Sequence, residues 1–390
     1  METFALKISF VYDAAYPWVK GGVEKRIYEL SNRLSNRGHD VRIYTFKRWD
    51  GPDIVKYDGV TYCSLGGKKG LYNHGRRSFV EAIYFAIRTF RIKVSKHEIV
   101  DVQSFPYFHL FPLKIITLLK RGTFVVTWHE VWKDYWIDYL NKKFYLGILG
   151  IAIENLSAHL TNNNIGNSLT TVIRLNSINR GSAEMIPNGV DINQFKEIEA
   201  SSKKYDLVST SRFVREKRLD VLVRAVGLLK ATYPHIRAIF IGDGPEYASV
   251  RRLIHDLGLD DNIELTGFLD KHESVISIVK SSKVFVSASI REGFFLSALE
   301  AMACGVPSVL TLSRMNAGVE LINSEPITGW VSSCDFESLA RTLELALHGY
   351  QGLRTNCLTK AASFDWNLIV NRLLLYYEKI QKDILTDQVI

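Results

Sequence analysis

Short apolar runs alternate along the chain with segments in which apolar residues recur every three or four positions. In the first half, Val23, Ile27, Leu30 and Leu34 follow this helical spacing, and Gly38 ends the segment. A second amphipathic helix is expected over residues 79–94. The apolar runs expected to form strands are 6–12, 41–46, 60–65, 99–103 and 123–128. Strands separated by helices of this length predict right-handed βαβ units and a parallel sheet.

The same alternation starts again after the turn-rich segment 187–191. Strands are expected at 206–210, 236–241, 263–266, 284–288 and 308–311. Helices are expected at 219–231, 247–257, 295–303 and 336–348, with a last helix at about 366–381. The fold class predicted is therefore α/β, with two Rossmann-like, doubly wound domains.

The chain of 390 residues has room for two such domains and a tail. We expect a first domain over residues 1–190, a second over 191–364, and a C-terminal segment, 365–390, whose helix packs against one of them. In parallel α/β sheets, ligands bind at the carboxyl ends of the strands, so the loops that follow strands are where chemistry is expected.

Charge separates the two halves. Residues 1–195 contain 26 basic and 17 acidic side chains, a balance of +9, whereas residues 196–390 contain 23 and 24, a balance of −1. The basic half suggests an anionic partner, such as a phosphorylated substrate, a membrane surface or nucleic acid. Its basic and aromatic residues follow no RNA-binding pattern, so no nucleic acid is expected.

The same composition limits the cellular setting. The four cysteines lie far apart and form no C-x-x-C pair, so neither a disulfide scaffold nor a zinc ribbon is expected. No run of 18 apolar residues is present, and residues 1–12 resemble a first strand rather than a signal peptide. The expected location is cytoplasmic, with peripheral binding to the cytoplasmic face of a membrane as an option.

Three loops after expected strands have features suited to phosphate. Gly21 and Gly22 open a helix, where backbone can approach an anion, although the spacing is not that of a dinucleotide-binding loop. Arg212 and Lys217 follow the strand at 206–210, and two cations there suit a diphosphate. The segment from Gly242 to Gly244 also follows a strand. Each of the three is equally compatible with an ordinary turn.

Two carboxylates and one histidine complete the candidates. Glu292 is expected on a loop and Glu300 in the second turn of the helix that follows it, on one side of that helix. An acid within the apolar run at 296–304 needs a partner, and carboxylates accept hydrogen bonds from sugar hydroxyls. His129 ends the strand at 123–128, where it could polarise a substrate near neutral pH or be structural. No P-loop, catalytic Ser-His-Asp arrangement or metal-binding histidine cluster is apparent.

Taken in order, these motifs resemble the GT4 family of retaining glycosyltransferases, which have the GT-B fold. The resemblance covers nearly the whole chain. The matching segments are Gly21-Gly22-Val23-Glu24, Arg37-Gly38-His39-Asp40-Val41, His129, Ile186-Pro187-Asn188-Gly189-Val190-Asp191, Arg212 with Lys217, Gly242-Asp243-Gly244-Pro245, Glu292-Gly293-Phe294 through Glu300-Ala301, and Phe364-Asp365-Trp366. Each is weak or moderate alone, and their joint order is specific.

The resemblance implies a role for each candidate. Gly21 and Gly22 would donate backbone N–H groups to donor phosphates, and His129 would contact the transferred sugar. Arg212 and Lys217 would neutralise the diphosphate leaving group in place of a metal. Glu292 would bind hydroxyls of the transferred sugar, and Glu300 those of the ribose. The remaining donor-binding positions implied are Gly242, Gly244, Phe294, Phe295 and Leu296.

The reaction implied is transfer from a nucleotide diphosphate sugar, such as a UDP- or GDP-sugar, with retention and without a metal or other cofactor. The basic first domain would bind the acceptor, suggesting a lipid-linked or cell-surface glycan, and the last helix would return to that domain. One departure is Phe295, where the family commonly has glycine. It favours an alternative, a catalytically silent GT-B subunit or membrane-associated scaffold.

A peripheral membrane contact has its own candidates in the basic half. The helix expected at 79–94 has one apolar side, and the pairs Lys68-Lys69 and Arg76-Arg77 precede it. Together they predict salt-sensitive binding to anionic lipid. The same helix could equally pack on the sheet.

Overall fold

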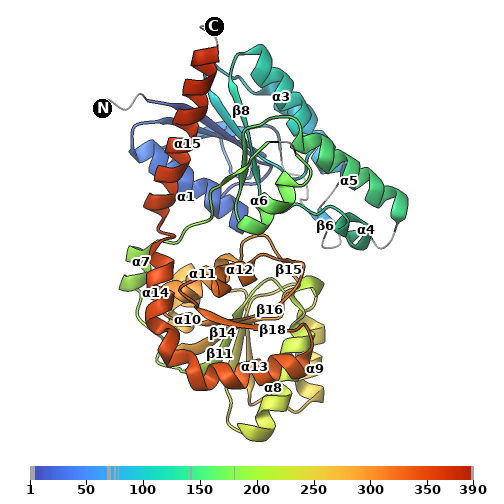
Figure 1. The fold of residues 1–390 in the computed structure, drawn as a ribbon, viewed down its shortest axis with the longest axis vertical. Coiled ribbons are helices and arrows are strands. Elements are labelled where there is room, and N and C mark those ends of the chain that lie inside the picture. The colour runs from blue at the N-terminus through green and yellow to red at the C-terminus, as the bar shows by residue number, and fades with distance from the viewer. Residues whose placement is uncertain are drawn as a thin grey trace. The chain divides into compact units, whose positions relative to one another are not determined.

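The computed structural model describes residues 5–67, 72–73, 76–77, 79–140, 143–179 and 181–387 (Figure 1). Lys68 and Lys69 lie outside these residues, as do the side chains of Arg76 and Arg77. The described chain forms two compact units, Met1–Asn188 with Trp366–Ile390, and Gly189–Asp365.

The first unit is built on an eight-stranded sheet with the order β10-β9-β8-β7-β1-β2-β4-β3. All its pairings are parallel except that of β3 with β4. The strands are β1 (Lys7–Val11), β2 (Asp40–Thr45), β3 (Ile54–Tyr57), β4 (Val60–Ser64), β7 (Ile99–Gln103), β8 (Thr123–Trp128), β9 (Asn164–Gly166) and β10 (Glu184–Met185); β5 (Tyr72–Asn73) and β6 (Arg76–Arg77) form a separate hairpin.

The helices of this unit divide between the two faces of the sheet. They are α1 (Gly22–Asn36), α2 (Phe79–Arg88), α3 (Leu110–Leu119), α4 (Tyr135–Tyr139), α5 (Phe144–Ala158), α6 (Leu169–Asn176) and α15 (Trp366–Asp387). The crossover through α1 runs from β1 towards β2, whereas those through α2, α3, α5 and α6 run the opposite way. Because such crossovers are right-handed, α1 covers one face and the other four helices cover the opposite face.

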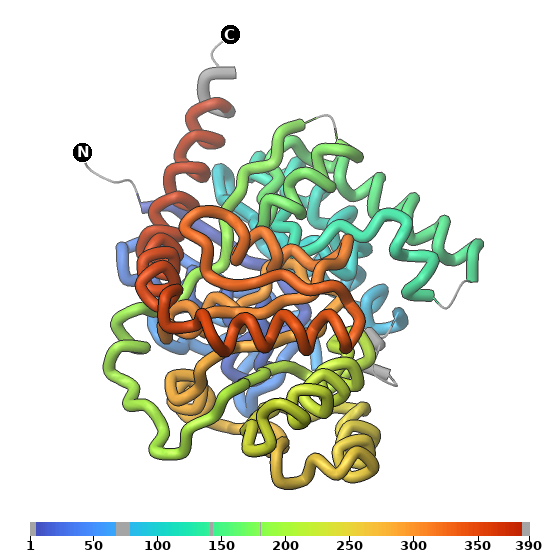
Figure 2. Tube along the Cα trace, turned by 60° about the horizontal axis from the view of Figure 1, so that its bottom comes forward, coloured from blue at the N-terminus to red at the C-terminus, as the bar shows by residue number. Residues whose placement is uncertain are grey.

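The tail helix α15 lies beside α1 (Figures 1 and 2). Its apolar side chains, among them Trp366, Leu373 and Tyr377, share a buried core with Ile8 of β1 and Ile27 of α1. The last helix therefore belongs to the first unit, as the resemblance implied.

The second unit has a six-stranded parallel sheet with the order β13-β12-β11-β14-β16-β18. Its strands are β11 (Tyr205–Thr210), β12 (Ala238–Ile241), β13 (Ile263–Gly267), β14 (Ser282–Ser287), β16 (Ser308–Thr311) and β18 (Gly329–Ser332), and β15 (Arg291–Glu292) pairs with β17 (Met315–Asn316). Its helices are α7 (Ile192–Glu197), α8 (Leu219–Thr232), α9 (Tyr247–Asp256), α10 (His272–Lys280), α11 (Leu296–Ala303), α12 (Gly318–Asn323), α13 (Phe336–Gly349) and α14 (Arg354–Ala362).

Neighbouring residues of these strands pack into two different hydrophobic cores, one on each face of the sheet. Leu207, Val284 and Val309 pack towards α8, α9 and α13, whereas the neighbouring Val208 and Phe285 pack towards α10, α11 and α14. Side chains of a strand alternate between the faces of its sheet, so strands covered on both faces are apolar throughout. This unit is doubly wound as predicted.

Each sheet has one point at which the direction of winding reverses. In the first unit it lies between β1 and β7, and in the second between β11 and β14. At such a point the loops leaving the two strands diverge and open a crevice at their carboxyl ends. Candidate residues on the loops beside either point are therefore the ones best placed to bind a ligand.

Two expected elements differ from those observed. The helix expected over 79–94 ends at Arg88 and is followed by a 3₁₀ turn, Thr89–Arg91. The loop expected at Glu292 contains the short strand β15, which the loop after β16 holds in place: Ala317 N donates to the Glu292 carbonyl over 2.8 Å.

Candidate functional site

An ion pair spans the reversal point of the second sheet. Lys217 lies in a 3₁₀ turn, Arg215–Lys217, after β11, and Glu292 lies in β15 after β14. The Lys217 Nζ donates to Glu292 Oε1, and both side chains are largely buried, with exposed fractions of 18% and 13%. Both residues are candidates on sequence grounds, but their pairing could not be expected from positions that are 75 residues apart.

The backbone around this ion pair is braced. The Glu216 carbonyl accepts from Ile290 N over 3.0 Å, joining the two loops directly. The buried amide of Asn316 donates to the carbonyls of Ser289 and Thr311, at 3.1 and 2.9 Å. These bonds join the loops that contain Lys217 and Glu292 to each other and to the end of β16. Arg212, on the same loop as Lys217, is exposed.

The second carboxylate, Glu300, lies in the second turn of α11. Its Oε1 is 2.9 Å from His272 Nε2, and its side chain is 14% exposed. His272 is the first residue of α10, a helix that the apolar pattern did not predict. Glu300 therefore has the partner that an acid in an apolar helix requires. That partner, His272, lies in the crossover from β13 to β14 and was not among the candidates from the sequence.

Phe295 precedes α11 in a left-handed conformation, with φ of 67° and ψ of 63°. Glycine, which the resemblance implies at this position, adopts positive φ without steric cost, whereas Phe295 adopts it at a cost. The Phe295 side chain is 5% exposed and packs in the core against Phe285 and Gly318. The centroid of its ring lies 5.8 Å from Lys217 Nζ, so the ring also borders the ion pair. Phe294 is also buried, and Leu296 is partly buried.

Gly242 and Gly244 are needed for a close approach of two backbones. A Cβ on Gly242 would lie 1.8 Å from the Ser211 carbonyl oxygen, and one on Gly244 would lie 2.5 Å from that of Phe213. Phe213 N donates to the Asp243 carbonyl over 2.8 Å. The loops after β11 and β12 are therefore joined, and the two glycines support the loop that contains Arg212.

In the first unit, Gly21 and Gly22 begin α1 after β1. Both are exposed, and Gly21 is the N-cap with no side-chain cap. A Cβ on Gly22 would meet nothing within 4 Å. Gly22 is therefore not required by packing, and the 15-residue helix α1 directs the amide groups of its first turn to an exposed position.

His129 follows β8 and contacts the loop after β7. One of its ring nitrogens, Nε2, lies 2.7 Å from Gln103 Oε1. The surrounding protein and, to a lesser degree, the charge of Arg26 lower the pKa of His129 to about 3. The imidazole is therefore neutral near pH 7, and Nε2 is the protonated nitrogen that donates to Gln103. Gln103 is a second residue that sequence analysis did not identify.

A buried polar chain continues from Gln103 towards the tail helix. The amide of Gln103 donates to Asp101 Oδ1 over 3.2 Å, and the hydroxyl of Tyr377 in α15 donates to Asp101 Oδ2 over 2.6 Å. Thr127 adds a third hydrogen bond, of 2.7 Å, to Asp101 Oδ1. Burial raises the pKa of Asp101, and these hydrogen bonds oppose that rise. The orientation of His129 is thereby coupled to the packing of α15.

No cluster of histidine, cysteine or acidic side chains suited to a metal ion occurs in the described part of the chain. Within the same residues, no helix is both long and apolar enough to cross a bilayer.

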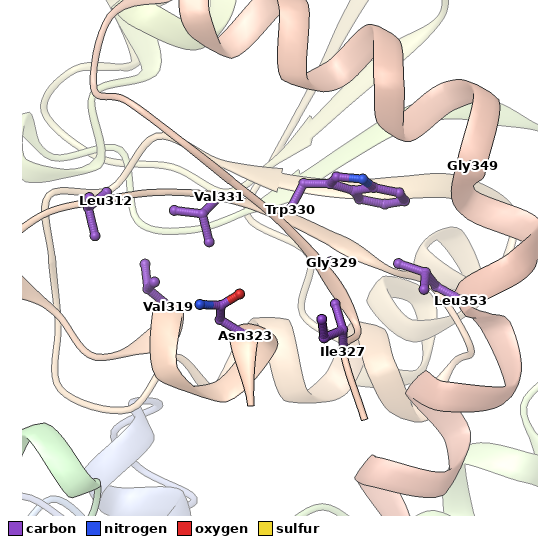
Figure 3. A pocket seen from close by; sticks show the side chains of 9 residues that line it. All are labelled: Leu312, Val319, Asn323, Ile327, Gly329, Trp330, Val331, Gly349 and Leu353. Atoms are coloured by element: carbon purple, nitrogen blue, oxygen red, sulfur yellow. The ribbon is translucent and has the colours of Figure 1, made fainter. Parts of the chain in front are cut away.

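One pocket of about 600 Å³ lies elsewhere in the second unit (Figure 3). It borders the edge strand β18, with Val319, Ile327 and Trp330 among its lining residues. It contains none of the residues predicted for the site.

Comparison with known proteins adds to this geometry. A family model described as "Glycosyltransferase Family 4" matches residues 20–194, and one described as "Glycosyl transferases group 1" matches residues 190–363. A phosphatidylinositol N-acetylglucosaminyltransferase subunit of Arabidopsis thaliana is 26% identical over 353 residues, which are 88% of this chain and 74% of that protein. The Homo sapiens protein of the same name is 27% identical over 78% of this chain and 61% of its own length, which is less than two thirds.

Solved structures share the fold. Sucrose-phosphate synthase from Thermosynechococcus elongatus superposes with a TM-score of 0.78 at 18% identity, over 96% of this chain and 99% of its own. HepE from Anabaena, in complex with UDP and glucose, superposes with a TM-score of 0.70 at 17% identity, over 95% and 98%. At these identities the likeness is one of fold, and it confirms the predicted class of two doubly wound α/β domains.

Proposed function

The chain belongs to the GT4 family of glycosyltransferases, which the two models together match over residues 20–363, and we propose that it transfers a sugar from a nucleotide diphosphate sugar to an acceptor hydroxyl with retention at the anomeric carbon. The observation that carries the proposal is the pairing of Lys217 with Glu292 at the reversal point of the second sheet. A cation and a carboxylate held side by side suit the two parts of a sugar diphosphate, its phosphates and its hydroxyls.

We assign the donor to the second unit. Lys217 and the exposed Arg212 would bind the diphosphate, and Glu292 would accept hydrogen bonds from hydroxyls of the transferred sugar. Glu300, oriented by His272, would bind the ribose hydroxyls. A phosphate that binds Lys217 would share the Lys217 ammonium with Glu292. Because the Lys217 side chain is 18% exposed, the phosphate can reach this charge without a rearrangement of the protein.

In the first unit we propose the acceptor site and an anion-binding position. The first turn of α1, at Gly21 and Gly22, suits an anion. His129, being neutral, would act as a hydrogen-bonding group towards a sugar hydroxyl rather than as a cation. Its Nδ1 is the unprotonated nitrogen when Nε2 donates to Gln103, so it would accept a hydrogen bond from a sugar hydroxyl.

The reaction needs a stabilised leaving group and an aligned acceptor. The bond between the anomeric carbon and the diphosphate oxygen breaks, the acceptor oxygen bonds to that carbon from the same face, and the acceptor proton passes to the departing phosphate. Lys217 and Arg212 would offset the negative charge that develops on the diphosphate. We therefore propose that no metal ion and no further cofactor is required.

The relatives guide the choice of substrates. We propose a UDP-sugar as the first donor to test, because HepE is described in complex with UDP. For the acceptor we propose a lipid or lipid-linked glycan at the cytoplasmic face of a membrane, because the Arabidopsis and human relatives are named for transfer to phosphatidylinositol. The excess charge of +9 in residues 1–195 suits such an anionic acceptor. Phe295 gives the silent-subunit alternative no support, because its side chain is in the core.

The test is nucleotide release from a panel of UDP- and GDP-sugars, with the anomeric configuration of the product read by NMR. We expect an α-linked product from an α-linked donor, and unchanged turnover in EDTA. Lys217→Met and Glu300→Gln should lose at least about a hundredfold in turnover, the scale of removing a group that stabilises developing charge.

A matched control is available in the same unit. Lys203 and Glu264 form an ion pair on the surface, away from the reversal point. Lys203→Met should keep the wild-type rate. Equal rates for Lys217→Met and Lys203→Met would show that the site is placed wrongly, and a product with inverted configuration would exclude retention.

A further inference from the structure

One helical layer of the first unit exposes large apolar side chains to solvent. These exposed side chains lie on and beside α2, α3 and α5, three of the helices that cover the same face of the eight-stranded sheet. The exposed residues, which we call the apolar helix face, are Phe79, Val80, Ile83, Ile87 and Phe90, then Ile115, Leu118 and Leu119, then Phe144, Tyr145, Ile148, Leu149 and Leu156. Scattered exposed apolar residues are normal, whereas a group of this size on adjoining elements marks an interaction surface.

The helix α5 shows that this exposure is not simply a missing core contact. Its inner side is closely fitted to α4, because a Cβ on Gly147 would lie 2.7 Å from Ile137 and one on Gly150 would lie 2.6 Å from Trp136. Its outer side nevertheless contains Tyr145 and Leu149, which are 71% and 50% exposed. In Figures 1 and 2 the segment of α4 and α5, coloured blue-green to green, projects from the rest of its unit.

The charges around the apolar helix face have one sign. Residues 79–96, 110–121 and 143–158 contain eight Lys or Arg side chains and two acids, Glu81 and Glu154, both of which are buried. The exposed cations are Arg91, Lys93, Lys96, Lys120, Arg121 and Lys143. Acidic side chains return on and beside α4, where Asp134 and Asp138 are exposed. Along these three segments, the exposed charged side chains are therefore all cations.

We propose that the apolar helix face docks on a lipid bilayer containing anionic lipids, its apolar side chains entering the interface and its cations lying among the headgroups. A bilayer presents hydrocarbon and negative charge side by side, and this face matches both. A second copy of the chain would match only the apolar side chains of this face, because a symmetric contact would bring the cations of both copies together. The docking face deepens the membrane location proposed for this glycosyltransferase and rests on that proposed function.

The apolar part is tested by vesicle flotation of the full chain with phosphatidylcholine, with and without phosphatidylserine. Wild type should float with the mixed vesicles. Leu119→Ser combined with Leu149→Ser should lower vesicle affinity about tenfold or more. The control combines Leu345→Ser with Leu375→Ser, two leucines that are 63% and 66% exposed on α13 and α15, and should bind as wild type does.

The electrostatic part is tested by charge reversal. Lys120→Glu with Arg121→Glu should abolish the dependence on phosphatidylserine, and added salt should weaken wild-type binding. Arg251→Glu with Arg252→Glu, an exposed basic pair on α9, makes the same change of charge elsewhere. Equal losses from both pairs would show that net charge rather than this face decides binding, and would overturn the proposal.

Two other results would also overturn it. One is that the wild type fails to float with mixed vesicles at low salt. The other is that the wild type forms a concentration-dependent dimer that Leu119→Ser with Leu149→Ser disrupts, because a second copy of the chain would then cover the apolar helix face. Melting temperature in UDP, measured without vesicles, reports separately on the proposed function. Flotation without a change of melting temperature in UDP would refute the donor site and leave the docking face supported. A higher melting temperature in UDP without flotation would support the donor site and refute the docking face.

Discussion

The side chain of Phe295 and the missing side chain of Gly318 occupy the same space. A Cβ on Gly318 would lie 2.4 Å from Phe295 Cδ1 and 2.8 Å from Phe295 Cβ. Phe295 adopts a left-handed φ of 67°, which costs a non-glycine residue about 1–2 kcal/mol. Burial of the ring, which is 5% exposed, offsets that cost.

These distances predict a specific non-additivity. Phe295→Gly should lose about 3–5 kcal/mol of burial and packing and regain about 1–2 kcal/mol of backbone strain, a net loss of about 1–4 kcal/mol. Gly318→Ala in the wild type should cost about 1–3 kcal/mol by overpacking. In the Phe295→Gly background the space is vacant, so Gly318→Ala should cost little or nothing. The coupling free energy should thus be about 1–3 kcal/mol.

The assay is urea denaturation of the wild type, both single variants and the double variant, followed by circular dichroism. Additivity to within about 0.5 kcal/mol would refute the packing argument, because contacting residues must couple. The Phe295 ring also lies beside the proposed donor-site cation, with its centroid 5.8 Å from Lys217 Nζ. Folded Phe295→Gly should therefore bind the nucleotide more weakly than the wild type, because Lys217 loses this contact. An unchanged affinity would mean that the ring does not help to position Lys217.

Other predictions concern the buried polar chain and the glycines. Tyr377→Phe should destabilise the protein by about 1–3 kcal/mol in urea denaturation, because the buried Asp101 carboxylate loses a hydrogen-bond donor; an unchanged free energy of unfolding would contradict the network. The NMR signals of His129 should not titrate between pH 5 and 8, since its pKa is about 3. The stability that this depressed pKa provides should be complete above about pH 6.5 and decline as pH falls towards 3, because the unfolded chain then binds the proton; a titration near pH 6.5 would contradict the lowering of the pKa of His129 by the surrounding protein. Gly242→Ala should be strongly destabilising in thermal melts, because its Cβ meets a carbonyl oxygen at 1.8 Å, whereas Gly22→Ala should melt as wild type does and lose turnover; the reverse order would exclude the roles given to the two loops.

The apolar pattern predicted most strands of the two sheets. The strands at 99–103, 123–128 and 308–311 were predicted with the bounds observed. They are central strands covered by helices on both faces, and such strands are continuous apolar runs that end sharply. The edge strand β3 was missed, because three of its four residues are exposed and it has no apolar run.

Helices without a polar side were not recognised. The residues of α3 and α5 are apolar nearly throughout and therefore show no helical period. Their apolar character became meaningful only when the structure showed which side chains stay exposed. The helix α10 was missed as well, and with it His272, the partner of Glu300.

The candidate site could be predicted as a set of loops but not as a set of contacts. Loops after parallel strands converge at one end of a sheet, so Lys217 and Glu292 were identified without knowing the strand order. Their pairing depends on β11 and β14 being neighbours, which the strand order alone decides. The contact of His129 with Gln103 depends likewise on the pairing of β7 with β8.

The most direct test of the donor site is calorimetric titration of UDP into wild type, Lys217→Met and Lys203→Met. We expect wild type and Lys203→Met to bind with the same affinity, and Lys217→Met to bind about tenfold or more weakly, the loss expected for one charged hydrogen bond to phosphate. Equal affinity in all three proteins, or no binding of UDP or GDP to the wild type, would contradict the proposed donor site.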